Sequence, residues 1–155
     1  MTFRIRGLDA QQFTTYVGLD DDALRARNAR RVRADKCPGY PDRVELRDAL
    51  PGETLLLLNF EHQQAASPYR ASHAIYILEH AVQAFDAVDE VPQVLRSRVI
   101  SLRAFDDSGM LKGAELCPGD ELESSIEQLL QPTSTSYLHL HYARHGCFAC
   151  RVDRV

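Results

Sequence analysis

Residues 53–62 read ETLLLLNFEH and contain four consecutive leucines, at 55–58. A short apolar run bounded by polar residues is typical of a strand in the core of a sheet. The polar stretch QQAASPYRAS follows at 63–72, and a second apolar stretch predicts a strand at 73–79. We therefore expect the two strands to form an antiparallel hairpin at the centre of the fold.

The remaining expected elements are short. We expect strands at 3–6, 99–105, 110–116, 137–142 and 147–152, and helices at about 10–16, 21–33, 91–98 and 120–131. The helix at 120–131 has the clearest pattern, because its apolar residues recur at the i, i+4, i+7 and i+8 positions. Strands joined by short turns, with helices that do not alternate with them, predict an α+β fold with a mostly antiparallel sheet. At 155 residues, the chain is expected to form one domain, residues 1–155.

The composition narrows the class of protein. Hydrophobic residues make up 45% of the chain and charged residues 26%, which is ordinary for a globular protein. The net charge of −4 argues against a nucleic-acid binder and against attachment to an anionic membrane. The opening residues lack the apolar segment of a secretory signal, and four cysteines do not suggest a disulfide framework. We therefore expect a cytoplasmic protein.

Two histidines lie at the ends of the central strands. Because side chains alternate between the faces of a strand, His62 shares a face with Phe60, and His73 shares one with Ile75. If His62 pairs with His73, then Phe60 pairs with Ile75 and the apolar faces are in register. The alternative is that both histidines cap the edge of the core, each bonded to a carbonyl or a water.

The connection between these strands adds further polar side chains. Gln63, Ser67, Tyr69, Arg70 and Ser72 all lie in it. Long loops are often functional, and a guanidinium beside imidazoles suits a small anionic molecule. We predict that His62 and His73 act as general acid or base, and that Tyr69, Arg70, Ser72, Gln63 and His141 bind the ligand. No cofactor is assigned.

The segment YLHLHYARHGCFAC at 137–150 is the second group of reactive residues. His139 and His141 share one face of a strand, which is a reasonable beginning for a zinc site completed by a thiolate. However, Cys147 and Cys150 are three residues apart, so a regular strand places their sulfurs on opposite faces. We assign no metal ligand from the sequence. A mononuclear metal site of both histidines and one cysteine stays open as an alternative.

The turn within this segment decides what lies beside Cys147. A two-residue turn at 145–146 sets His141 opposite Cys150, whereas a turn at 144–145 sets His139 opposite Cys150. In the first register Arg144 and His145 lie near Cys147, where their charge favours a thiolate and makes this cysteine the candidate nucleophile. The alternative is a half-buried cysteine that fills a strand position.

The sequence contains one basic and one acidic segment that could contact a partner. Residues 25–36 hold six basic side chains against one acid, and residues 106–127 hold seven acids against one lysine. These clusters are either two solvated faces or a contact between copies of the chain, in which case the protein is a homo-oligomer. A non-catalytic interaction module is therefore a further alternative.

Four segments carry a family resemblance. ETLLLLNFEHQQAASPYRASHAIYIL (53–78), HYARHGCFACRVDR (141–154), DEVPQVLRSR (89–98) and FRIRGL (3–8) resemble the bacterial domain-of-unknown-function family numbered 1203. The resemblance covers nearly the whole chain and implies a small, stand-alone cytoplasmic bacterial protein without an assigned activity. The matching segments contain His62, Gln63, Ser67, Tyr69, Arg70, Ser72, His73 and Cys147. Whether the protein is an enzyme stays open.

Overall fold

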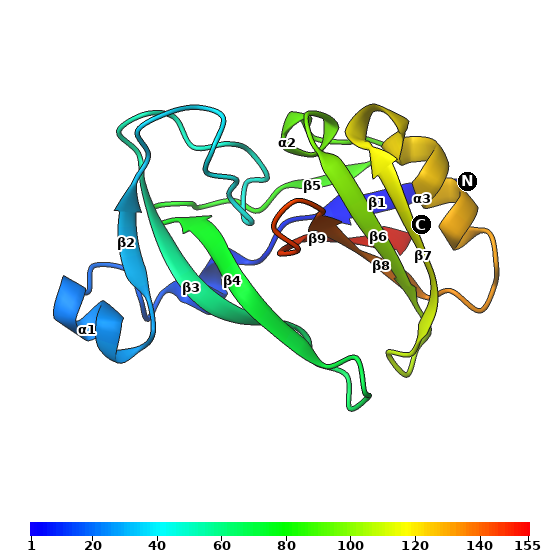
Figure 1. The fold of residues 1–155 in the computed structure, drawn as a ribbon, viewed down its shortest axis with the longest axis horizontal. Coiled ribbons are helices and arrows are strands. Elements are labelled where there is room, and N and C mark those ends of the chain that lie inside the picture. Colours follow the sequence, from blue (N-terminus) through cyan, green and yellow to red (C-terminus); the bar gives the residue numbers. More distant parts are fainter.

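The computed structural model describes all 155 residues, which form two antiparallel sheets with short helices (Figure 1). The larger sheet has the order β5 (Asp86–Val88), β1 (Phe3–Arg6), β9 (Phe148–Arg154), β8 (Tyr137–Tyr142), β6 (Val99–Phe105), β7 (Leu111–Pro118). The smaller sheet has the order β2 (Arg30–Arg33), β3 (Thr54–Gln63), β4 (Ala71–Leu78). The helices are η1 (Ala10–Phe13), α1 (Asp21–Ala26), α2 (Gln93–Arg96), η2 (Gly119–Glu121) and α3 (Leu122–Leu130). The predicted α+β fold is confirmed.

Helix α3 packs against β6, β7 and β8 of the larger sheet. Strand β8 is buried along its whole length because both of its faces are covered. Leu138 and Leu140 belong to the hydrophobic core that includes α3, whereas His139 and His141 lie on the opposite face, against His62 of β3. Neither α3 nor any other helix combines the length and the apolar character that a membrane crossing requires.

The segment between β2 and β3 holds the two sheets together. The carboxylate of Asp42 accepts the backbone N–H of Leu78, in β4, at 2.7 Å. The next side chain, Arg43, is only 1% exposed and donates from Nε to the carbonyl oxygen of Phe148, in β9, at 2.8 Å. Adjacent residues therefore fix one strand of each sheet, and the faces that meet between the sheets are set by these two bonds.

The tips of two hairpins also meet, at the lower edge of Figure 1. Ser67, in the β3–β4 loop, donates from Oγ to the carbonyl oxygen of Gly109, in the β6–β7 turn, at 2.9 Å. Gly109 has φ +76°, and a Cβ at this position would lie 2.3 Å from the Cβ of Ala65. Glycine is therefore needed here both for the turn and for the contact between the two sheets.

The prediction of a helix over 21–33 is wrong in its second half. Helix α1 ends at Ala26, and Asn28 adopts a φ of +55°, which a continuing helix cannot accommodate. The chain then forms β2, which pairs with β3 at the edge of the smaller sheet. Tertiary pairing outweighs local helix propensity here. The short strand β5 was also not expected.

Both predicted hairpin registers are wrong. In the central hairpin Phe60 pairs with His73, and His62 lies in a bulge between the neighbouring pairs, because β4 begins at Ala71, earlier than expected. In the closing hairpin His141 pairs with Phe148, across a loop of residues 143–146 and a second bulge. Bulges change which residues oppose each other while leaving the strands themselves intact.

Candidate metal centre

Three histidines meet between the two sheets: His62 of β3, and His139 and His141 of β8. A nitrogen atom of each ring lies within 4.8 Å of a nitrogen atom of the other two. The ring of His62 is 5.0 Å from that of His141 and 6.0 Å from that of His139, measured between centroids. Alternation along β8 places His139 and His141 on one face, and His62 completes the group from the other sheet.

Phe148 packs against all three rings. It stacks on His62 with a centroid separation of 5.2 Å and an interplanar angle of 6°. It meets His139 and His141 edge-on at 5.1 and 5.9 Å. The backbone of Phe148 is itself held by the bond from Arg43. Because a packed aromatic neighbour restricts ring rotation, the three histidines are held in position before any ligand arrives.

Each of these rings has a buried nitrogen without a hydrogen-bond partner: Nδ1 of His62, Nδ1 of His139 and Nε2 of His141. The other nitrogen of His141, Nδ1, lies 3.0 Å from the carbonyl oxygen of Gly146. Donation from Nδ1 to this carbonyl leaves the lone pair on Nε2. An unpaired buried polar atom costs about 1–3 kcal/mol, so three in one cluster indicate a site for a further group.

All three histidines are neutral at pH 7. Burial lowers the pKa of His62 to about 4, and lowers those of His139 and His141 to about 3. Coordination of a metal requires neutral imidazole, which these low pKa values provide. A general base works best with a pKa near the working pH, so the same values argue against acid–base catalysis by these residues.

A pocket of about 500 Å³ opens beside the cluster. It is lined by His62, Gln63, Gln64, Ala65, Asp107, Ser136, Tyr137, His139 and Arg151. One wall bridges the sheets, because Gln63 donates from Nε2 to the hydroxyl of Tyr137 at 3.0 Å. Two of the three histidines therefore face a space of the size that small-molecule ligands occupy.

The loop residues predicted to bind a ligand lie outside this pocket, except for Gln63. Arg70 makes a two-bond ion pair with Glu61, at 2.6 and 3.1 Å, so its charge is already balanced. Tyr69 packs edge-on to Phe105 with a centroid separation of 6.2 Å. Ser72 is exposed on β4.

The structure also separates the two central histidines that the sequence suggested as a pair. His73 is exposed on β4, where its Nδ1 lies 3.2 Å from the carbonyl oxygen of Ala74. His62 instead joins His139 and His141. Of the residues predicted for the site, the structure therefore brings together His62, His141 and Gln63.

No cysteine belongs to the histidine cluster. Cys150 pairs with Leu140 and is fully buried in the core on the opposite face of the sheet, where burial raises the pKa of its thiol. Cys147 is half-buried, and its Sγ accepts a hydrogen bond from Nη2 of Arg43 at 3.0 Å. The cation that contacts Cys147 is thus the buried Arg43, which sequence analysis did not select.

Arg103 is a second arginine that sequence analysis did not select. It lies on β6 opposite His139. The side chain is half-buried, and burial lowers the pKa of its guanidinium. The sequence predicted a strand at 99–105. It did not predict that this strand pairs with 137–142, nor the register that sets Arg103 opposite His139.

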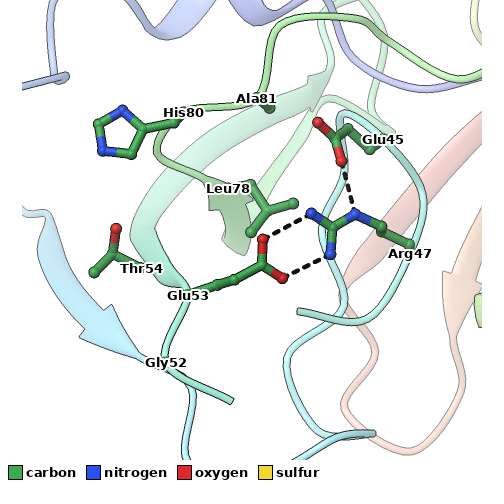
Figure 2. Close-up of a pocket in the computed structure, with 8 residues that line it drawn as sticks. All are labelled: Glu45, Arg47, Gly52, Glu53, Thr54, Leu78, His80 and Ala81. Atoms are coloured by element: carbon green, nitrogen blue, oxygen red, sulfur yellow. Dashed lines mark hydrogen bonds and ion pairs between the residues drawn. The ribbon is translucent and has the colours of Figure 1, made fainter. Parts of the chain in front are cut away.

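A second pocket, of about 250 Å³, lies at one end of the smaller sheet (Figure 2). Its ionic side chains are bonded to one another. Arg47 donates from Nη1 and Nη2 to both oxygens of Glu53, at 2.7 and 2.8 Å, and from Nε to Glu45 at 2.7 Å. Hydrogen bonding to Arg47 lowers the pKa of Glu53 to about 2. Because its ionic groups already have partners, we regard this pocket as a structural ion-pair network.

Comparison with known proteins places the chain in a family. The family described as "Protein of unknown function (DUF1203)" matches residues 39–154. The chain belongs to this family. All three histidines of the cluster, with β3 and β8, lie inside the DUF1203 match, whereas β1, α1 and β2 precede it. No curated protein and no solved structure matches the chain.

Proposed function

We propose that this DUF1203 protein binds one divalent transition-metal ion, with Zn²⁺ as the first candidate, through His62, His139 and His141. The proposal rests on the three converging imidazoles, each with a buried nitrogen that has no partner. Imidazole is a preferred ligand of zinc, copper, nickel and iron. Three protein ligands leave at least one coordination position open, as in catalytic zinc sites.

The spacing of the rings supports this assignment. Zinc–nitrogen bonds of about 2.0–2.1 Å place the nitrogens of a tetrahedral site about 3.4 Å apart. The bond from His141 to Gly146 is the kind of outer contact that orients a ligating histidine.

The site offers no negative charge to the metal, because no carboxylate or thiolate belongs to the cluster. A bound dication therefore keeps its full charge and acts as a Lewis acid that lowers the pKa of a coordinated water. The chain holds the ion, packs Phe148 against the three rings and leaves the pocket beside His62 and His139 open. This arrangement favours a metal centre that acts on a small molecule.

Acid–base catalysis without a metal is the second candidate, and it is the weaker one. The low pKa values leave the three histidines unprotonated at neutral pH and poor at accepting a proton. His73 lies outside the cluster. A nucleophilic Cys147 would also need a base beside it, and its contact is with the guanidinium of Arg43.

We also propose a bacterial, cytoplasmic location for this metal protein. The four cysteines are all free thiols, which suits a reducing compartment. Fractionation of cells that express the tagged protein from its own start site tests the location directly.

Metal content after gel filtration tests the proposed function. The protein is stripped with a chelator, loaded with Zn²⁺, passed through a desalting column and analysed by mass spectrometry of the metal. We expect about one zinc ion per chain in the wild type. His62→Phe keeps a ring on Phe148 but removes the nitrogens, and should retain less than roughly a tenth of the zinc. The exposed His80, outside the cluster, supplies the control variant His80→Ala.

Two results would contradict the proposal. The first is a wild-type protein that emerges without zinc while remaining folded by circular dichroism. The second is equal zinc content in wild type, His62→Phe and His80→Ala, which would place the ion elsewhere on the chain. Loss of zinc in His62→Phe counts only if its circular dichroism spectrum matches that of the wild type.

A further inference from the structure

Two arginines flank the histidine cluster on the larger sheet. Arg103 of β6 pairs with His139 on one side, and Arg151 of β9 pairs with His139 on the other. Directly opposed residues of neighbouring strands lie on the same face of a sheet. Both arginines therefore share with His139 the face that is turned towards β3, where His62 completes the cluster.

These two arginines differ in what they contact. Arg151 forms an ion pair with Asp153 at 2.7 Å, and its guanidinium lies 4.0 Å from the centre of the Tyr137 ring. Arg103 is half-buried yet makes no ion pair and no side-chain hydrogen bond within the chain. A guanidinium has five N–H donors, and a partly buried one normally finds an acceptor.

The charge of Arg103 reaches the cluster. Arg103 is directly opposed to His139 on the neighbouring strand, on the face that carries the histidine cluster. A guanidinium beside a dication is electrostatically unfavourable, since like charges repel and the surroundings are partly buried. An anion that contacts both groups replaces this repulsion with two attractions.

We propose that Arg103 binds an oxyanion group of a small molecule, a carboxylate or a phosphate, which also coordinates the metal at its open position. The inference rests on the proposed metal site. The planar guanidinium offers two parallel N–H groups that match two oxygens of such an anion. Arg103 is not among the residues that line the pocket of about 500 Å³, so the anion binds at the metal, and the remainder of the molecule extends past His62 and His139 into the pocket.

This role has a signature that a structural arginine lacks. Metal and oxyanion should each raise the affinity of the other by the same factor, because the coupling is reciprocal. Arg103→Gln removes the repulsion, so in buffer free of oxyanions it should bind the metal at least as tightly as the wild type. The same variant should lose most of the enhancement that the oxyanion gives. A structural arginine would weaken both when replaced.

The test uses Co²⁺ as a spectroscopic stand-in for Zn²⁺, with the full-length protein. Acetate and methylphosphonate are titrated into the Co²⁺ protein, and the change in the visible absorption bands gives the dissociation constant of each. Arg103→Gln should raise the dissociation constant of the more tightly bound anion by roughly 10- to 100-fold, which is the effect expected for loss of a charge-assisted hydrogen bond. Arg33→Gln is the matched control, since Arg33 is an exposed arginine on β2 of the other sheet.

The outcomes separate the two proposals. Absence of any visible Co²⁺ bands in the wild type would overturn both the metal site and the oxyanion role. Normal bands with equal dissociation constants in wild type, Arg103→Gln and Arg33→Gln would overturn only the role of Arg103. A selective loss in Arg103→Gln supports it, and the tighter probe then identifies the class as carboxylate or phosphate.

Discussion

The ion-pair pocket and the histidine cluster differ in how their polar atoms are paired. In the pocket of Figure 2, Arg47 is bonded to both Glu45 and Glu53. In the cluster between the sheets, each of three histidines keeps a buried nitrogen without a partner. In the first arrangement the charged groups bond to one another, whereas in the second one nitrogen of each histidine stays unpaired.

This contrast is the reason for proposing that the histidine cluster, and not the ion-pair network, binds a ligand. A network whose polar atoms are paired stabilises the fold and has little to offer a ligand, because a ligand would have to replace existing bonds. A cluster with unpaired buried atoms lowers the stability of the free protein and recovers that free energy on binding. The following experiments test the contrast, beginning with the largest expected effect.

A fall in pH should destabilise the protein mainly through the histidine cluster, and this is the largest effect that we expect. In the metal-free protein the three cluster histidines have folded-state pKa values of about 3 to 4, below the usual value of about 6.5. The unfolded chain therefore takes up more protons as pH falls from about 6.5 towards 4, and the free energy of unfolding should drop by several kcal/mol. Urea denaturation in chelator at a series of pH values measures this. His62→Phe should give a shallower slope in that window, and an unchanged slope would contradict the burial of a neutral His62.

Zinc should stabilise the folded protein through the cluster alone. At a free concentration about a thousand times the dissociation constant, binding to the folded state adds about 4 kcal/mol to the free energy of unfolding. Differential scanning calorimetry should show a raised melting temperature for wild type and for Glu53→Gln. For His62→Phe, zinc should raise the melting temperature hardly at all. A zinc response that Glu53→Gln abolishes would mean that the ion binds in the pocket of Figure 2.

Glu53→Gln should weaken the fold without affecting the metal. The substitution removes one partner of Arg47, and because both side chains are about a third exposed the cost should be about 1 kcal/mol. The folded-state pKa of Glu53 is lowered to about 2, so its contribution is present above pH 4.5 and is lost as pH falls through 2. Urea denaturation of both proteins at pH 7 and pH 3 should show a smaller difference at pH 3. An equal difference at both values would mean that the carboxylate charge is unimportant.

Tyr142→Phe should have the smallest effect. The hydroxyl of Tyr142 is the one buried side-chain atom without a partner that lies outside the histidine cluster. The ring of Tyr142 lies on the core face of β8, with the guanidinium carbons of Arg43 and Arg98 at 4.9 and 5.3 Å from its centre. Removing the hydroxyl should leave stability unchanged or raise it by up to about 1 kcal/mol, with zinc affinity unaltered. A marked loss of zinc would show that the two faces of β8 are coupled.

Local patterns in the sequence were enough for much of the fold. The apolar run at 55–58 lies in β3, and the spacing of Leu122, Ile126 and Leu130 matches α3. Local patterns failed where the conformation depends on single backbone angles, as at Asn28, or on bulges, as at His62. A bulge leaves the composition of a strand unchanged, so its effect on register cannot be read from the residues.

The sequence predicted only part of the candidate site. Alternation along 137–142 placed His139 and His141 on one face, which the structure retains. That His62 joins them depends on Asp42 and Arg43, which fix β4 and β9 relative to each other. Contacts between separate sheets are set by such tertiary bonds, and no periodicity in the chain encodes them. For the same reason Arg103 could not be placed beside the cluster.

X-ray absorption spectroscopy of the zinc-loaded protein tests the central claim most directly, because it reports the atoms bound to the metal. The account requires about three imidazole nitrogens at roughly 2.0 Å, one or two further oxygen or nitrogen ligands and no sulfur. His62→Phe should lower the imidazole contribution to about two. A zinc–sulfur shell near 2.3 Å, or a shell of oxygens without imidazole scattering, would contradict it.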